Sequence, residues 1–141
     1  MADKKVELRV ISPQMATDKK PYKFKKDVDM VIIRCTTGDL GILAGRVPCS
    51  MVLDAGILRI LNNDGESRMA IMGGVAHVYS DVVTVLSDSA LHPDEIDVDA
   101  VRAEISESER LFSEASDYKE RDVHKSNLHR LKVQLEVAGY R

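Results

Sequence analysis

The positions of glycine and proline divide this sequence into two parts. Seven of the eight glycines lie between positions 38 and 74, whereas residues 94–138 contain neither glycine nor proline. Glycine permits tight turns and close backbone approaches, and both residues weaken the interior of a helix. The second part is rich in Ala, Glu, Leu, Lys and Arg, which favour helix. The sequence therefore predicts a β-rich domain over residues 1–90 and a helical domain over residues 91–141.

Short apolar or alternating runs fill the first part. Residues 6–11 alternate apolar and polar side chains, and residues 30–35 form an apolar run of strand length. Turn-forming residues return at intervals of roughly ten positions, which is typical of an antiparallel sandwich or barrel. We expect one strand to begin at Gly56 and another to end at Gly73, since glycine often interrupts strands. These two strands are expected at residues 57–61 and 68–72, and further ones at residues 22–24, 50–53, 75–79 and 82–86.

Residues 38–48 concentrate three glycines and Pro48 among apolar side chains. The segment is too apolar for a disordered linker, and it lacks the Gly-x-x-x-x-Gly-Lys-Ser/Thr pattern of a phosphate loop. We interpret it as a tightly turning corner of β structure. Asp39 and Arg46 lie at or beside its turns, where side chains are exposed, so both are candidate contact residues.

The second part has the periodicity of amphipathic helices. Its apolar residues recur at helical spacing, with Ser108 in a gap of the first stripe. After Pro93, either Asp94 or Asp97 is a suitable N-cap for the first helix. The apolar stripe loses its helical phase near residues 116–118, so we expect a break between two helices there. The apolar positions are Val98, Val101, Ile105, Phe112 and Ala115 in the first helix, and Leu128, Leu131, Leu135 and Ala138 in the second.

The two predicted helices differ in charge. Residues 94–117 carry nine acidic and two basic side chains, and residues 119–141 carry six basic and three acidic ones. Opposite charge suits an antiparallel hairpin, although each exposed ion pair contributes only ~0–1 kcal/mol. Because each apolar stripe is narrow, the hairpin needs a third surface, either the β domain or another protein. We expect a tail that can dock and undock.

Composition and charge limit the compartment and the class of partner. The formal net charge of −3 argues against a nucleic-acid binder. No apolar run reaches the ~18 residues of a membrane span, and the sequence leads directly into an alternating strand, without a signal peptide. Two cysteines make no disulfide framework, so a cytoplasmic protein with reduced thiols is expected.

The sequence offers no catalytic machinery. Cys35 and Cys49 have neither a CxxC partner nor an adjacent His or Lys that would lower a thiol pKa. We expect them to pack as ordinary core residues, and a thiol-dependent redox enzyme is the enzymatic alternative. His124 and His129 are five residues apart, so they do not share a helix face as a metal-binding pair would. No metal site is predicted.

Asp99 and Arg102 are three residues apart at the start of the first helix, on one face. One interpretation is an ion pair between them. The other is that Arg102 holds an anion together with Arg130 of the second helix, because guanidinium groups suit phosphate oxygens.

Several of these segments resemble the epsilon subunit of bacterial F-type ATP synthase. Residues 38–48 (GDLGILAGRVP) are similar to the family signature G-[ED]-[LI]-G-I-x-P-G-H-x-P, with Ala44 and Arg46 in place of its Pro and His. Residues 56–60 (GILRI) resemble G-x-[LIV]-R-[LI]. Further similarities lie at residues 72–86, 99–103 and 129–133, in the family's order and at its spacing.

The resemblance implies an α+β fold, with a β-sandwich of about ten strands followed by a two-helix antiparallel hairpin. It implies a non-catalytic rotor subunit at the cytoplasmic face of the bacterial cell membrane, which couples proton flow to ATP synthesis. The sandwich would contact the gamma subunit and the c-ring. The chain itself would not insert into the membrane and would not bind nucleic acid. The helices would fold on the sandwich or extend toward the alpha and beta subunits, where they inhibit ATP hydrolysis.

The resemblance also implies roles for single residues. Asp39 corresponds to the acidic position of the c-ring contact, and Arg46 to a rim position near gamma. Asp99, Arg102 and Arg130 correspond to positions that contact ATP in some members, where ATP favours the compact form and no cofactor is otherwise required. The alternative, from a different class, is a β-sandwich binding module with a helical dimerisation tail.

Overall fold

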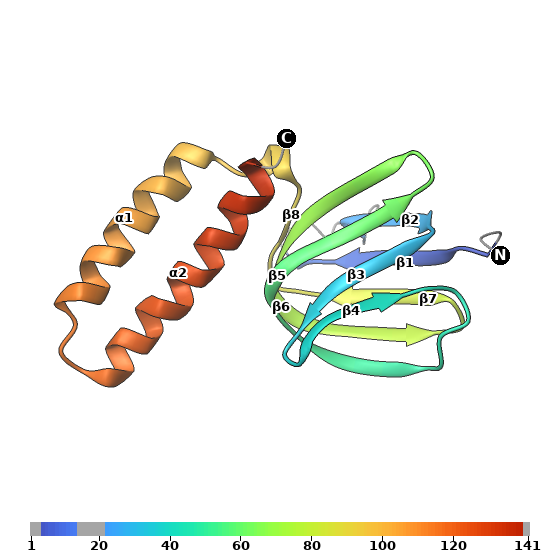
Figure 1. Ribbon diagram of the computed structural model, residues 1–141, viewed down its shortest axis with the longest axis horizontal. Helices are drawn as coiled ribbons and strands as arrows, with labels where there is room; N and C mark the ends of the chain where they lie inside the picture. The colour runs from blue at the N-terminus through green and yellow to red at the C-terminus, as the bar shows by residue number, and fades with distance from the viewer. Residues whose placement is uncertain (1–3, 14–21, 140–141) are drawn as a thin grey trace. The chain divides into compact units, whose positions relative to one another are not determined.

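The computed structural model describes residues 4–13 and 22–139. The chain divides into two compact units between Ala90 and Leu91, and each unit is described by itself (Figure 1). The strands are β1 (Val6–Ile11), β2 (Phe24–Val28), β3 (Met30–Cys35), β4 (Gly38–Ile42), β5 (Cys49–Asn62), β6 (Gly65–Tyr79), β7 (Val82–Leu86) and β8 (Ala90–Leu91). The helices are η1 (Pro93–Glu95), α1 (Val98–Glu114) and α2 (Tyr118–Gly139).

The β unit is a sandwich whose two layers share one long hairpin. The strands pair in the order β2-β1-β7-β6-β5-β3-β4, and β8 pairs with β6. β7 pairs with residues 75–79 of β6, whereas β3 pairs chiefly with residues 59–61 of β5. The two ends of the β5–β6 hairpin therefore belong to opposite layers (Figure 1). The predicted fold class, a sandwich followed by two helices, is confirmed.

Two expected strand boundaries are wrong. Gly56 lies inside β5 rather than at its start, and Gly73 lies inside β6 rather than at its end. Gly73 and Gly74 have φ values of +85° and +117°. These left-handed conformations, which glycine reaches without strain, bend β6 just before the part that pairs with β7. The strands that we expected separately are thus halves of β5 and β6.

One pair of strands differs from the expected antiparallel arrangement. β1 and β7 are parallel, with Leu8 opposite Val83 and Val10 opposite Val85. The intervening strands return the chain to the starting end of the sheet, so the pair needs no crossover helix.

Aliphatic side chains fill the space between the layers, as the absence of tryptophan requires. The inward residues of β1 alternate with half-buried ones that face outward, which confirms the alternation of residues 6–11. The most buried large core residues are Leu8, Ile33, Ile42, Leu58, Met69, Val6, Val10, Val28, Val31, Val78, Val83 and Val85.

The helical unit is a hairpin of two adjacent antiparallel helices (Figure 1). Asp97 is the N-cap of α1, and its side chain accepts a hydrogen bond of 3.2 Å from the Ala100 N–H. Residues 115–117 connect α1 to α2 at the predicted break. No helix in the described part of the chain combines the length and apolarity that crossing a bilayer requires.

Candidate functional site

The glycine corner, residues 38–48, comprises β4 and the segment that leads to β5. Gly38 and Gly45 have φ values of +123° and +87°, in the region that favours glycine. The segment that follows β4 presents two large apolar side chains to solvent, Leu43 and Val47. The corner therefore exposes apolar as well as charged side chains.

Asp39 and Arg46 are both exposed on this corner, as the sequence predicted. Asp39 lies in β4 directly opposite Arg34 of β3, and its carboxylate accepts a hydrogen bond of 3.2 Å from that guanidinium. Exposed pairs of this kind are weak, so the carboxylate can exchange Arg34 for another partner. What Asp39 and Arg46 contact stays a prediction.

A row of branched apolar residues crosses the outer face of one layer. Val52 lies opposite Val75, Val75 lies opposite Leu86, and Leu86 lies opposite Ile11. Directly paired residues share a face of the sheet, so these four, called the apolar row below, form one surface across four strands. Val52 is 60% exposed, Val75 45% and Leu86 44%. Contiguous exposed apolar surface of this kind marks interaction sites.

A polar row runs beside the apolar one. The hydroxyl of Ser50 lies 2.9 Å from Nδ1 of His77, its direct neighbour on β6. The ring of His77 stacks with Tyr79, with centroids 6.5 Å apart. The outer face thus combines an apolar row with a hydrogen-bonding edge, which is the composition of a protein interface. This surface was not predicted from the sequence, because the strands around Gly56 and Gly73 were expected separately and the pairing of β1 with β7 is not local.

The two cysteines differ in environment. Cys35 is buried and Cys49 is half-buried. Burial raises the pKa of the Cys35 thiol, with smaller contributions from Asp39 and Cys49 and an opposing one from Arg46. A reactive thiol needs a lowered pKa, so this environment favours the packing role expected for Cys35. In the described residues, no group of three or more His, Cys, Asp or Glu side chains could hold a metal.

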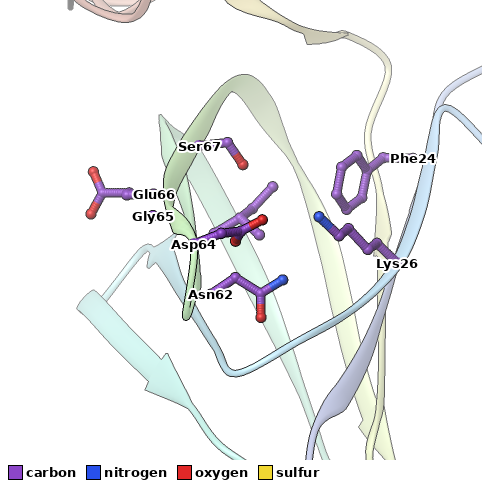
Figure 2. Close-up of a pocket in the computed structure, with 8 residues that line it drawn as sticks. Phe24, Lys26, Asn62, Asp64, Gly65, Glu66 and Ser67 are labelled. Atoms are coloured by element: carbon purple, nitrogen blue, oxygen red, sulfur yellow. The ribbon is translucent and has the colours of Figure 1, made fainter.

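A cleft of about 220 Å³ lies at the tip of the β5–β6 hairpin, beside β2 (Figure 2). Phe24 and Lys26 point toward Asp64 and Asn62 across it, while Glu66 points away (Figure 2). Glu66 is engaged instead by Arg59 and Arg68, at 2.6 and 2.7 Å. The cleft brings one ammonium group to one carboxylate and has no concentration of charge of one sign, so it lacks the features of an anion site.

The candidate anion residues all lie on the helical hairpin. Asp99, Arg102 and Arg130 are exposed, and in the described residues no hydrogen bond or ion pair within 4 Å joins any two of them. The ion pair considered for Asp99 and Arg102 is thus not formed. Arg102 and Arg130 are both exposed, and their role in anion binding stays a prediction.

Contacts between the helices give their register. Asn127 contacts Ser108, and the guanidinium of Arg121 lies 5.0 Å from the ring centroid of Phe112. Continuing this antiparallel register places Arg102 and Arg130 within about one helical turn of each other along the hairpin. The structure brings the two arginines to one level of the hairpin but does not pair them.

The sandwich, the glycine corner and the helical hairpin define a class of protein. Residues 5–93 match the family model described as ATP synthase, Delta/Epsilon chain, beta-sandwich domain. The chain is similar, at 34% identity over 94% of its length and 94% of the relative, to the ATP synthase epsilon chain of Trichodesmium erythraeum. The epsilon chain of Bacillus pumilus is 31% identical, over 96% of this chain and 98% of the relative. The chain belongs to the ATP synthase epsilon-chain family.

A solved structure supports the fold. A chain of the cryo-EM structure of Euglena gracilis mitochondrial ATP synthase, which contains F1 and the c-ring, superposes with a TM-score of 0.78. The match covers 96% of this chain and 82% of that chain, at 24% identity. At this identity the likeness establishes the shared fold.

Proposed function

We propose that this chain is a non-catalytic rotor subunit of the ATP synthase central stalk. In this proposal the apolar row binds the gamma subunit, and the glycine corner, with Asp39 and Arg46, contacts the c-ring and the adjoining rim of gamma. The chain is then held peripherally at the cytoplasmic face of the membrane and helps to couple proton flow to ATP synthesis. The helices regulate ATP hydrolysis by reaching the alpha and beta subunits when they extend.

The apolar row is the observation that carries this proposal. Its members lie on four adjacent strands in the middle of a layer, where exposed valine and leucine have no structural purpose within the sandwich. Such a surface is stabilised by a partner that excludes water from it. A stalk subunit that turns with its partner needs a broad, permanent contact of this type rather than a narrow cleft.

The test is the affinity of the full chain for the isolated gamma subunit. Val75→Glu places a charge in the middle of the row, so we expect binding to weaken at least tenfold, because a buried unpaired charge costs several kcal/mol. Asn63→Glu adds the same charge at the exposed β5–β6 turn and serves as the matched control, with affinity within about twofold of wild type. Unchanged affinity of Val75→Glu would remove the apolar row from the gamma interface.

We further infer that the helical hairpin binds ATP weakly through Asp99, Arg102 and Arg130. The support is the pair of solvent-directed guanidinium groups at one level of the hairpin, which suit phosphate oxygens. Arg102→Gln and Arg130→Gln should each weaken ATP binding at least threefold in isothermal titration, whereas Arg110→Gln, which removes an arginine already engaged by Glu107 and Glu114, should not. Absence of heat with wild type at millimolar ATP would refute this binding.

A further inference from the structure

The seam between α1 and α2 contains one buried polar residue among the described residues of the helical unit, Ser108. It occupies the position in the apolar stripe of α1 that lies seven residues after Val101, the other buried residue of that helix. Apolar residues at alternating spacings of three and four along each helix form the contact between two paired helices. A single polar residue in that contact fixes how the two helices align along their length, at a cost in stability.

Asn127 of α2 meets Ser108 across this seam. Its Nδ2 donates a hydrogen bond of 3.0 Å to the Ser108 hydroxyl, and the Asn127 side chain is otherwise exposed. Water can replace either partner as the helices separate, so this contact opposes opening much less than an aliphatic contact would. The Ser108–Asn127 hydrogen bond therefore aligns the two helices but contributes little to the free energy that holds them together.

The two halves of α2 differ on either side of this contact. The second half contains the four buried residues of the helix, Leu131, Val133, Val137 and Ala138. Within residues 118–127 none is buried, and two large side chains face solvent, Tyr118 at 83% exposure and Val123 at 66%. The first half therefore has little apolar contact to hold it.

The tip of the hairpin is also loosely packed. Arg121 covers the ring of Phe112, but a cleft of about 210 Å³ remains beside them, lined also by Tyr118, Asp122 and Lys125. A cation on an exposed ring contributes roughly 0.5–1 kcal/mol in general. A side chain over an open cleft does not replace the packing of a buried leucine.

We propose that residues 118–127 of α2 unfold locally and separate from α1, with the Ser108–Asn127 pair as the boundary of the opening unit. Residues 128–139 stay folded during this opening, because their buried side chains are unaffected. Regions with few buried apolar contacts open below the free energy of global unfolding. The opening frees the ring of Phe112 and the inner side of residues 118–127 for a partner surface. Its regulatory meaning rests on the proposed function, whereas the opening itself does not.

Amide hydrogen exchange of the full chain, without any partner, tests this proposal. In wild type we expect the amides of residues 122–127 to be at least tenfold less protected than those of residues 131–137. The variant Ser108→Ala/Asn127→Leu replaces the polar pair by an apolar one, so protection of residues 122–127 should rise at least tenfold. Protection of residues 131–137 should stay within about twofold.

Ser126→Leu is the matched control, since it adds a leucine to the same segment at an exposed position beside Asn127. We expect it to change protection of residues 122–127 by less than threefold. Equal protection along the whole of α2 in wild type, or an equal rise in both halves in the double variant, would show that α2 opens as one unit and overturn the proposal. Because no gamma subunit and no ATPase assay enter this experiment, its result is separate from the outcome of the gamma-binding test.

Discussion

The backbone N–H of Gly45 donates a hydrogen bond of 2.7 Å to Oδ1 of Asp81. This bond joins the glycine corner to the turn between β6 and β7. The carbonyl oxygen of Asp81 also accepts a hydrogen bond of 2.8 Å from the N–H of Glu7, at the start of β1. Asp81 therefore fixes the corner relative to the strands that carry the apolar row.

Substitution of Asp81 should loosen this end of the sandwich. Asp81 has a φ of +61°, a left-handed conformation that Asp and Asn tolerate better than Ala. Asp81→Ala loses the acceptor and adds strain, so we expect the free energy of unfolding to fall by about 1–3 kcal/mol. Asp81→Asn keeps an acceptor oxygen and should lose less than about 1 kcal/mol. Urea unfolding followed by circular dichroism measures the stability of both variants. Equal losses would show that the side-chain oxygen of residue 81 does not stabilise the corner.

Gly74 and Gly38 provide a matched pair of glycine substitutions. Both have strongly positive φ, +117° and +123°. A Cβ atom at Gly74 would meet the Leu86 carbonyl oxygen of the neighbouring strand, whereas one at Gly38 would meet no atom within 4 Å. Gly38→Ala should therefore cost only the backbone strain, about 1–3 kcal/mol. Gly74→Ala should cost at least ~2 kcal/mol more, because β6 or β7 must move. Thermal unfolding of the two variants measures this difference. Similar melting temperatures would contradict a close contact between residue 74 and the Leu86 carbonyl oxygen.

Local signals in the sequence predicted the elements, but the surfaces between them depend on long-range pairing. The alternation of residues 6–11 and the cap at Asp97 each depend on a few neighbouring residues, and both are present in the structure. Val52 and Leu86 share a face only because β5, β6 and β7 pair in one particular register. The turns at residues 63–64 and 80–81 fix the registers of these two hairpins. The strands expected to be bounded by Gly56 and Gly73 did not carry that register as far as Val52, and the parallel pairing of Ile11 with Leu86 is not local, so the apolar row was not predicted.

The glycines show the same limit in another form. One strand was expected to begin at Gly56 and another to end at Gly73, yet both glycines lie within long strands. The positive φ of Gly73 bends its strand rather than ending it, because the neighbouring strand follows the bend. Gly56 instead leaves room for the side chain of Arg34, which a Cβ atom there would meet. Ser108 was visible as a gap in the stripe of α1, but its partner Asn127 became apparent only with the register of α2.

Glu66 should make stability depend on acid pH. Hydrogen bonds from Arg59, and then from Arg68, lower the pKa of the Glu66 carboxyl from its usual 4.5. The folded protein therefore keeps this carboxylate charged at lower pH than the unfolded chain does. The resulting stability is present above the unfolded-state pKa and is lost as the pH falls through the lowered folded-state pKa. These side chains are partly exposed, so the contribution is at most about 1 kcal/mol.

The variant Glu66→Gln isolates this effect. At pH 7 it should be less stable than wild type by up to about 1 kcal/mol, and the difference should vanish below the folded-state pKa of Glu66. Urea unfolding at a series of pH values measures the difference. In an Arg59→Gln/Arg68→Gln background the same substitution should have little effect at any pH. A difference that persists there would assign the stability to packing rather than to charge.

Removal of the helices should leave a folded sandwich that still assembles. Every residue of the sandwich core cluster lies at or before Ala90. A chain that ends after Leu91 keeps β8, and it keeps the hydrogen bond of 3.0 Å from the Met72 N–H to the Ser89 carbonyl oxygen. We expect this truncated chain to be soluble and to bind gamma with an affinity within about twofold of the full chain. A chain that ends after Ser87 loses β8 and that hydrogen bond, so it should be less stable.

The same truncation separates docking from regulation in the assembled enzyme. If the helices inhibit hydrolysis, an ATP synthase reconstituted with the chain that ends after Leu91 should hydrolyse ATP faster than one with the full chain, at equal subunit occupancy. If the sandwich alone holds the subunit on the stalk, as proposed, the occupancy measured in the same preparation should not change. Equal hydrolysis rates at equal occupancy would rule out inhibition by the helices, and poor occupancy would mean that the helical unit contributes to the gamma contact.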